Sequence, residues 1–373
     1  MRPLKVVMVS AGFWPSIGGA ERQALELSAA LAARGHRVTV LTRRVGGLPP
    51  REERRGVSIR RLPSPGGVLD APVFLVGVLT WLLLCWTEWD AVHAHLAGSP
   101  ALAAALAGRL LGRPALVKLG GGRGIGELAV SSKSAAGRAK LRVLGLLRPR
   151  FLAVVPDLAE EARAFLGPVP IEVLPNGVDA ARYRPLDAAA KRARRAELGW
   201  DDGATVFLYA GRFSWEKRLP WFLKLWRESA SERALMALVG SGPKETEVAA
   251  EASLGRIEIL PAREDLTGLY AAADVFVLPS VSEGLSNALL EAMSSGLAVL
   301  GSRVGGTAET IADGRTGLLF DRDDENALQA AVKRLESEAG LAARLGGAAR
   351  AEVEARYAME RVVARVEELY RAS

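Results

Sequence analysis

The sequence predicts two α/β domains in tandem, each with a doubly wound parallel sheet, and two observations support this. First, short apolar segments alternate with segments of helical periodicity along the chain, which is typical of βαβ units and therefore of parallel sheets. Second, the chain has 373 residues, 49% of them apolar and 24% charged, so it can bury two cores. The composition excludes a disordered chain, and the single cysteine excludes a disulfide scaffold and cysteine-based metal clusters.

The first series of elements begins with an apolar strand at residues 5–10. Residues 20–33 carry Leu and Ala at helical spacing, and Gly35 ends that helix before the next strand at 37–42. This βαβ unit requires parallel strands. Further strands of the series are expected at residues 91–95, 115–118, 151–155 and 171–174.

The second series follows a polar, Arg-rich stretch at residues 182–202, where we expect the two domains to join. Its strands are expected at residues 205–210, 234–239, 256–260, 274–279, 298–302 and 317–320. Residues 354–371 place apolar side chains along one face and predict an amphipathic C-terminal helix.

Ligands of open parallel sheets bind beyond the carboxyl ends of the strands, so the loops after strands are the candidate sites. After the first strand, Gly18 and Gly19 precede a helix N-terminus whose free amides can receive a phosphate. A plain tight turn is the alternative. After the strand at 205–210, Arg212 and Lys217 place two cations that suit a departing diphosphate. A solvated basic loop is the alternative there.

Two carboxylates follow the strand at 274–279, with Glu283 in the loop and Glu291 on the next helix, eight residues later. Helical rise over eight residues amounts to roughly 12 Å, whereas a retaining glycoside hydrolase needs its carboxylates roughly 5 Å apart. We therefore interpret the pair as hydroxyl acceptors at opposite ends of one elongated ligand. Between them, Ser286 and Asn287 begin a helix whose N-terminus favours an anion.

Two of the three histidines, His93 and His95, lie at the end of the strand at 91–95. Strand alternation puts both on one face of the sheet, and a structural role and a role in a site both remain open for them. The third, His36, follows the helix-ending Gly35 and is interpreted as structural.

Together these segments resemble the retaining glycosyltransferases of family 4, also called group 1 glycosyltransferases, which have the GT-B fold. The resemblance covers nearly the whole chain and rests on the ordered set GGAERQALELSAALAARGHRVTVLT, DAVHAH, EVLPNGVDAARYRP, LYAGRFSWEKR, LVGSGP, LYAAADVFVLPSVSEGLSNALLEAMSSGLAVLGSRVGG and ADGRTGLLF. It implies two Rossmann-like parallel-sheet domains that face a cleft. It also implies that a C-terminal helix at 357–373 crosses back to the N-terminal domain. The expected domains are therefore an N-terminal one at 1–200 with this helix and a C-terminal one at 201–356.

The resemblance implies transfer of a hexose-type sugar from a nucleotide diphosphate sugar to an acceptor hydroxyl with retention of configuration, in cell-surface polysaccharide or glycolipid synthesis. In the family pattern, Glu283 would contact the donor sugar and Glu291 the ribose, while His95 would lie near the reacting sugar and the acceptor. Glu283, His95, Arg212 and Lys217 are therefore the expected catalytic residues. The expected donor-binding residues are Gly18, Gly19, Arg212, Lys217, Arg263, Glu283, Gly284, Leu285, Ser286, Asn287 and Glu291.

No cofactor and no metal are expected beside the nucleotide sugar. The DxD-like run 321–323 precedes a helix, so Asp323 or Asp324 is expected to cap that helix instead of binding a metal. Two positions depart from the family pattern. Residues 156–157 are Pro-Asp where many relatives carry a Ser, which affects an acceptor contact, and residues 261–262 are Pro-Ala where Gly is frequent, which affects recognition of the base.

Charge is distributed unevenly between the two halves. Residues 1–200 hold 29 Lys and Arg against 15 Asp and Glu, an excess of 14, whereas residues 201–373 hold 20 against 27. The basic half predicts an anionic acceptor, such as a lipid-linked sugar, or peripheral contact with an anionic membrane. An Arg-rich composition spread over a solvated surface is the alternative. Nucleic acid is not an expected partner, because no recognition module is evident.

Membrane contact is also suggested by two apolar segments. The longest uncharged run, residues 71–86, falls short of the roughly 18–20 residues of a spanning helix, and a buried core helix is favoured over an interfacial one. Residues 133–150 mix six basic residues with leucines, which is the composition of an interfacial helix. Because the N-terminus runs directly into a strand, we expect a cytoplasmic protein, peripheral at the inner face of the cell membrane if the basic half binds it.

Three other functions remain open. They are a GT-B nucleotide-sugar epimerase, transfer to a small soluble acceptor, and a non-catalytic relative that binds nucleotide without turnover. The presence of Glu283, Glu291, Arg212 and Lys217 argues against the non-catalytic relative.

Overall fold

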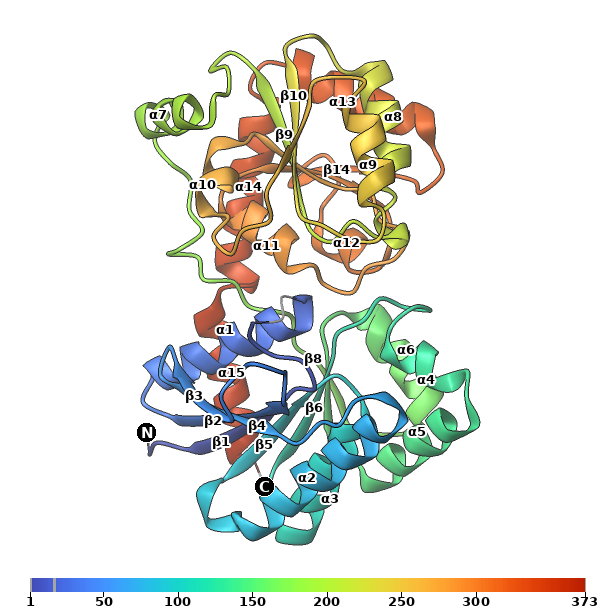
Figure 1. The fold of residues 1–373 in the computed structure, drawn as a ribbon. Helices are drawn as coiled ribbons and strands as arrows, with labels where there is room; N and C mark the ends of the chain where they lie inside the picture. The colour runs from blue at the N-terminus through green and yellow to red at the C-terminus, as the bar shows by residue number, and fades with distance from the viewer. Residues whose placement is uncertain (1, 16–17, 373) are drawn as a thin grey trace. The chain divides into compact units, whose positions relative to one another are not determined.

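In the computed structural model, which describes residues 2–15 and 18–372, the chain forms two α/β units (Figure 1). Unit 1 contains Met1–Gly177 and Met359–Ser373, and unit 2 contains Val178–Ala358. Each unit has its own sheet and its own buried core. The prediction of two parallel-sheet α/β domains is confirmed.

Unit 1 is built on an eight-stranded sheet in the order β3-β4-β2-β1-β5-β6-β7-β8. The edge strand β3 runs antiparallel to β4, and the other neighbouring strands pair in parallel. The inner strands are apolar on both faces because helices cover both faces. The strands are β1 (Lys5–Val9), β2 (Arg37–Arg43), β3 (Arg51–Arg54), β4 (Val57–Leu62), β5 (Ala91–His95), β6 (Ala115–Leu119), β7 (Arg150–Ala153) and β8 (Ile171–Val173).

Two groups of helices cover this sheet (Figure 1). α1 and α15 pack together on one face, over buried residues of the strands such as Met8 and Leu116. On the other face α3 contacts β5 and β6, and both α2 and α5 pack against α3. The helices of unit 1 are α1 (Gly19–Ala33), η1 (Gly67–Leu69), α2 (Asp70–Leu84), η2 (Trp86–Glu88), α3 (Ser99–Leu111), α4 (Glu127–Ser132), α5 (Ala135–Leu147), α6 (Pro156–Leu166) and α15 (Met359–Arg371).

Unit 2 is built on a six-stranded parallel sheet in the order β11-β10-β9-β12-β13-β14. Its strands are β9 (Thr205–Ala210), β10 (Ala234–Val239), β11 (Ile257–Leu260), β12 (Val275–Leu278), β13 (Ala298–Ser302) and β14 (Gly317–Phe320). Its helices are α7 (Ala188–Leu198), η3 (Trp215–Lys217), α8 (Leu219–Ser229), α9 (Glu245–Ala252), α10 (Thr267–Ala272), α11 (Asn287–Ser294), α12 (Gly305–Thr310), α13 (Glu325–Ser337) and α14 (Leu341–Arg356).

The predicted domain boundary at 200/201 lies too far along the chain, because residues 178–200 belong to unit 2. Within them α7 packs against α10, and the buried Arg195 donates to the carbonyl oxygens of Ala272 and Ala204 and to the Asp274 carboxylate. An Arg-rich segment that finds buried acceptors becomes part of a domain instead of a linker. With this boundary, unit 1 holds 26 Lys and Arg against 15 Asp and Glu, an excess of 11.

The predicted continuous helix at 354–371 is interrupted. α14 ends at Arg356, and Tyr357 accepts a hydrogen bond at its carbonyl oxygen from the Val178 amide, 2.9 Å away. After this break, α15 begins at Met359 and packs with α1 in unit 1. The amphipathic pattern is therefore divided between the end of one unit and a helix that returns to the other.

The apolar run expected to be a buried core helix forms α2, and most of it is not buried. Phe74, Val78 and Leu82, one residue per turn, are its buried residues. The overlapping segment Gly67–Leu84 has a mean hydropathy of 2.0 over 18 residues, so its length and composition alone would suit a membrane-spanning helix. Only 17% of this segment is buried. The interpretation as a core helix is therefore wrong for this segment.

Candidate active site

The loops at the carboxyl edge of the unit 2 sheet hold one another in place. The loop after β9 and the loop after β10 are joined by hydrogen bonds from the Phe213 amide to the Ser241 carbonyl oxygen (2.9 Å) and from the Lys244 amide to the Phe213 carbonyl oxygen (2.9 Å). A side chain at Gly242 would overlap the Phe213 carbonyl oxygen, so the approach requires glycine. The backbone that carries Arg212 and Lys217 is thus fixed by its neighbour.

Lys217 and Glu283, both predicted site residues, form an ion pair in this edge. Lys217 ends η3 after β9, and Glu283 lies in the loop after β12, the strand next to β9. Ser280 donates a second hydrogen bond to the same carboxylate oxygen, 2.6 Å away. Since Glu283 is buried, its charge is balanced by the ammonium and the hydroxyl.

The backbone of Glu283 is held by the loop after β13. The Gly306 amide donates to the Glu283 carbonyl oxygen at 3.1 Å. Gly305 has a φ of +39°, and a side chain there would overlap the same carbonyl oxygen. Three loops, after β9, β12 and β13, therefore position this carboxylate. Gly305 belongs to a segment that the sequence analysis singled out, but its contact with Glu283 was not predicted.

Around Glu291 the structure changes the geometry expected from the sequence. α11 begins at Asn287, four residues after Glu283, and is capped by Ser286, whose hydroxyl accepts from the Leu289 amide at 3.3 Å. Helical rise therefore does not measure the separation of the two carboxylates, and the expected figure does not apply. Glu291 itself is buried on α11, and Gly284 and Leu285 are buried in the loop before it.

The two predicted arginines of unit 2 are exposed. Arg212 follows β9, and its carbonyl oxygen accepts from the buried Tyr209 hydroxyl at 2.9 Å. Burial, together with the nearby charge of Glu283, raises the pKa of Tyr209 well above its usual value, so this hydroxyl keeps its proton. Arg263 lies in the loop after β11, where its Nε is 3.4 Å from the Pro261 carbonyl oxygen. Both guanidinium groups are accessible to a ligand.

In unit 1, His93 and His95 stack at the end of β5, with ring centroids 4.8 Å apart. This confirms that strand alternation puts both rings on one face. His93 is fully buried and its Nδ1 lies 2.8 Å from the hydroxyl of Tyr370 on α15. Burial lowers the pKa of His95 to about 3, and the neighbouring Lys118 adds to that shift. His95, the later of the two, lies at the carboxyl end of the strand.

Lys118 is a residue that sequence reasoning missed. It pairs with His95 across the β5–β6 ladder and is buried, and burial lowers its pKa to about 7. Its ammonium has no hydrogen bond or ion pair among residues 2–15 and 18–372. The signal in the sequence was a lysine inside an otherwise apolar strand, two residues before a run of three glycines.

The expected phosphate site at the start of α1 contains a carboxylate. Gly18 caps the helix without a side-chain hydrogen bond, and Gly19 is exposed. A side chain at Gly18 or Gly12 would overlap or touch the Glu21 carboxylate, so this acid lies beside the helix N-terminus, where the dipole favours it. The loop also includes residues 16 and 17, which lie outside the described residues.

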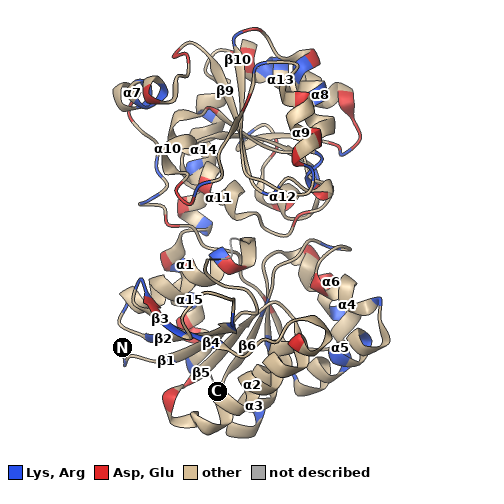
Figure 2. Cartoon of the chain, in the orientation of Figure 1, with Lys and Arg blue, Asp and Glu red and all other residues tan. Residues whose placement is uncertain are grey.

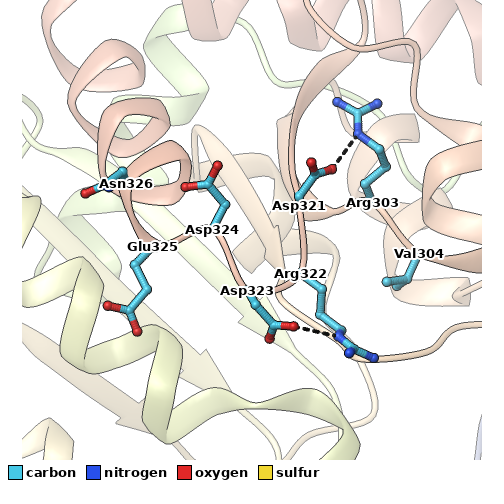
Figure 3. Close-up of a pocket in the computed structure, with 8 residues that line it drawn as sticks. All are labelled: Arg303, Val304, Asp321, Arg322, Asp323, Asp324, Glu325 and Asn326. Carbon is cyan, nitrogen blue, oxygen red and sulfur yellow. Dashed lines mark hydrogen bonds and ion pairs between the residues drawn. The ribbon is translucent and has the colours of Figure 1, made fainter.

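The DxD-like run lines an open hollow on unit 2 (Figure 3). Asp324 caps α13 by accepting from the Ala327 amide at 2.9 Å, as the sequence predicted. Asp321 pairs with Arg303, and Asp323 pairs with Arg218 and Arg322. The residues described in the structure contain no group of three or more His, Cys, Asp or Glu arranged to hold a metal ion.

Two segments of the chain match described protein families. Residues 204–338 match the family described as Glycosyl transferases group 1, and residues 17–182 match Glycosyltransferase Family 4. The chain is 36% identical over 186 residues to a D-inositol 3-phosphate glycosyltransferase of Nocardia farcinica, a match covering 44% of this chain and 41% of that protein. The chain thus spans less than half the length of this relative.

Two further similarities extend over most of the chain. It is 31% identical over 358 residues to a 2-deoxystreptamine N-acetyl-D-glucosaminyltransferase of Streptomyces fradiae, which covers 86% of this chain and 83% of that protein. Its fold is similar to that of HepE from Anabaena in complex with UDP and glucose, with a TM-score of 0.80 and 18% identity over 99% of this chain and 100% of that chain. At this identity the structural likeness shows the fold alone.

Proposed function

Because the chain belongs to the group 1 glycosyltransferases of family 4, we propose that it transfers a hexose-type sugar from a nucleotide diphosphate sugar to an acceptor hydroxyl with retention of configuration. The observation that carries this proposal is the ion pair between the half-buried Lys217 and the buried Glu283 at the carboxyl edge of the unit 2 sheet. Ligands of such sheets bind at this edge, and the pair supplies a cation for a diphosphate and a carboxylate for sugar hydroxyls.

The residues of unit 2 have distinct roles in this proposal. Lys217 and the exposed Arg212 neutralise the diphosphate as it leaves, and such preorganised charge accounts for much of the rate enhancement of transfer reactions. Glu283 binds hydroxyls of the donor sugar, and Glu291 binds the ribose. The Arg263 loop reads the base. Ser286 and Asn287 present the first turn of α11 to the donor.

Unit 1 receives the acceptor and the remaining contacts of the donor. By the family pattern, Gly18 and Gly19 would contact the diphosphate and His95 the reacting sugar, although the Glu21 carboxylate lies beside Gly18 in this structure. The depressed pKa of His95 keeps the imidazole neutral near pH 7, so it can accept or donate one hydrogen bond without adding charge. The acceptor proton passes to the departing phosphate on the same face of the sugar, which gives retention without a carboxylate nucleophile.

Support for a nucleotide sugar donor comes from the similar proteins. The HepE structure holds UDP and glucose, and the two relatives are named as transferases acting on D-inositol 3-phosphate and 2-deoxystreptamine. These names also support transfer to a small soluble acceptor, the first alternative. An epimerase and a relative without turnover are the others. No metal is required, because Arg212 and Lys217 provide the positive charge.

The second part of the proposal concerns the compartment and the acceptor. The excess of basic residues in unit 1, part of which is visible along α5 in Figure 2, favours an anionic acceptor and peripheral contact with the inner face of the cell membrane. The natural product is then a cell-surface polysaccharide or glycolipid precursor. Nucleic acid is not part of the proposal.

A donor screen tests the transferase proposal. Thermal shift with UDP-, GDP- and ADP-sugars should reveal one stabilising nucleotide, and product mass spectrometry with acceptor lipids and soluble sugar phosphates should reveal the acceptor. Proton NMR of the product should show the anomeric configuration of the donor, and EDTA should leave turnover unchanged. Absence of any nucleotide response would refute the proposal, and an epimerised donor without transfer would favour the epimerase.

A further inference from the structure

α2 presents apolar side chains that the described residues of unit 1 cover only in part. Its buried residues follow one line along the helix, most of its other apolar side chains are half-buried, and Val76 and Leu84 are exposed. Leu84 is 77% exposed and Trp86, just after the helix, is 53% exposed. A soluble core helix would bury these side chains, because each exposed apolar side chain forfeits hydrophobic stabilisation.

The exposed apolar residues of three helices gather at one end of unit 1. α2, α3 and α5 each follow a strand of the parallel sheet and precede the next, so their C-terminal ends return to the amino edge of the sheet. Leu84, Leu110 and Leu146 occupy those ends and are 77%, 62% and 76% exposed. The three leucines therefore belong to the same end of the helical layer. We call these residues, with Trp86, the apolar end.

Beside this end lies a basic cavity of about 380 Å³. Its lining includes the last residues of α3 and α5 and the first residues of β6 and β7. Four arginines contribute to it, and among the residues that the structure describes no Asp or Glu does. The arginines are Arg109, Arg113, Arg148 and Arg150.

Two of the four arginines donate to backbone carbonyl oxygens, and the other two have no partner among the described residues. Arg113 donates to the carbonyl oxygens of Trp86 and Trp89 and lies over both indole rings, at 5.7 and 4.9 Å from their centroids. Arg148 donates to the Pro168 carbonyl oxygen at 2.8 Å. For the side chains of Arg109 and Arg150, no hydrogen bond or ion pair exists within residues 2–15 and 18–372. An anion in the cavity would supply their missing partner.

We propose that the apolar end lies in the interface of an anionic membrane, with the phosphate of one anionic lipid in the cavity of Arg109 and Arg150. The bilayer fits both halves of this surface, because leucine and tryptophan side chains enter the acyl boundary while arginines reach the phosphates. α2 then meets the membrane surface with its C-terminal end. The inference rests on the proposed membrane contact and is independent of the proposed sugar transfer.

The test uses the full chain and vesicles of two compositions, phosphatidylcholine alone and phosphatidylcholine with about one third phosphatidylglycerol. The cavity variant is Arg109→Gln with Arg150→Gln. Its matched control, Arg51→Gln with Arg163→Gln, removes the same charge from exposed sites of unit 1 outside the cavity. We expect the cavity variant to lose about tenfold in affinity for anionic vesicles and the control to lose much less. Equal losses would overturn the headgroup site in favour of diffuse attraction.

The apolar end is tested by Leu84→Gln, with Leu254→Gln as the control at a similarly exposed leucine of unit 2. We expect weaker flotation for Leu84→Gln alone. A polarity-sensitive fluorophore on Leu84→Cys in a Cys85→Ser background gives a second readout, since Cys85 is the single cysteine of the chain. Its emission should shift to the blue with anionic vesicles. An unshifted emission, or a dimer that depends on Leu84 and ignores vesicles, would overturn the proposal.

Failure of the membrane contact is distinguishable from failure of sugar transfer. A chain that binds a nucleotide and turns over a soluble acceptor without floating with any vesicle would refute this inference and leave transfer intact. A chain that floats through the cavity arginines and binds no nucleotide would support this inference and refute transfer.

Discussion

His36 donates a hydrogen bond from Nε2 to Oε1 of Glu367, 2.8 Å away, although 331 positions separate the two residues. The assignment of the donor follows from the other ring nitrogen, since Nδ1 accepts from the Leu4 amide at 2.9 Å. Arg34 donates to both oxygens of the same carboxylate, at 2.7 and 2.9 Å. These hydrogen bonds link the turn after α1 to the returning helix α15. His36 therefore has the structural role that its position after Gly35 predicts.

Glu367→Gln should destabilise the fold and remove an acid transition. The hydrogen bonds from Arg34, followed by those from His36, lower the pKa of Glu367 to about 2 from an ordinary 4.5. The stabilisation is therefore complete above about pH 4.5 and is lost as the pH falls towards 2. We expect Glu367→Gln to cost about 1–2 kcal/mol near pH 7 in urea unfolding. The exposed neighbour Glu368→Gln is the control, and equal effects of both would contradict this prediction.

Glu283→Gln should reduce turnover while leaving the fold intact. The amide retains the hydrogen bond from Ser280 and loses the ionic attraction to Lys217, so the ammonium is no longer held at the edge of β9. We expect kcat to fall about 100-fold, with a change in melting temperature of a few degrees. The surface pair Lys244 and Glu247 offers the control, because Glu247→Gln breaks a similar ion pair on exposed α9. An unchanged kcat for Glu283→Gln would show that Glu283 is not part of the active site.

Gly305→Ala should impair donor binding through the backbone. Alanine at a φ of +39° is strained by about 1–2 kcal/mol, and its methyl group overlaps the Glu283 carbonyl oxygen. The loop that carries Glu283 must then move, so the KM for the donor should rise. Gly347→Ala is the control, since that helical position faces open space and alanine stabilises α14 by up to about 1 kcal/mol. An unchanged donor KM in Gly305→Ala would contradict the proposed role of the contact.

The elements that sequence predicted best are strands buried on both faces. A segment such as Thr205–Ala210 is a short apolar run between turn signals, and its bounds agree with the structure. β3 and β4 were missed because the buried positions of Val57–Leu62 are Val57, Ile59 and Arg61, and in a stretch rich in arginine this pattern suggests only surface charge. Alternation, not overall polarity, was the informative signal there.

For the site, the loops could be predicted and the contacts between them could not. Lys217 and Glu283 are 66 positions apart, and they meet because β9 lies next to β12 and not only next to β10. Strand order depends on how whole elements pack, which local patterns do not encode. The burial of Lys118 beside His95 has the same origin, since it follows from the pairing of β5 with β6.

Lys118→Met should stabilise the protein in a manner that depends on pH. Burial lowers the pKa of Lys118 to about 7 in the folded state, against 10.5 for an ordinary lysine. Below about pH 7 the fold therefore carries a buried ammonium at full cost, and stability rises as the pH increases from 7 towards 10.5, because the unfolded chain then holds the extra proton. Burial, and the neighbouring Lys118 after it, lowers the pKa values of His93 and His95, so both imidazoles are neutral here and neither supplies a counter-charge.

We therefore expect Lys118→Met to exceed the native chain in stability by about 1–3 kcal/mol near pH 6, with the difference shrinking towards pH 10. Urea unfolding at several pH values measures it. The exposed Lys133→Met, in the same unit, should show no such trend. If the stability of the native chain does not rise between pH 7 and 10, the Lys118 ammonium is either exposed to solvent or paired, and the prediction is wrong. If Lys118→Met also abolishes turnover while stabilising the fold, Lys118 is required for the reaction although its burial lowers the stability of the protein.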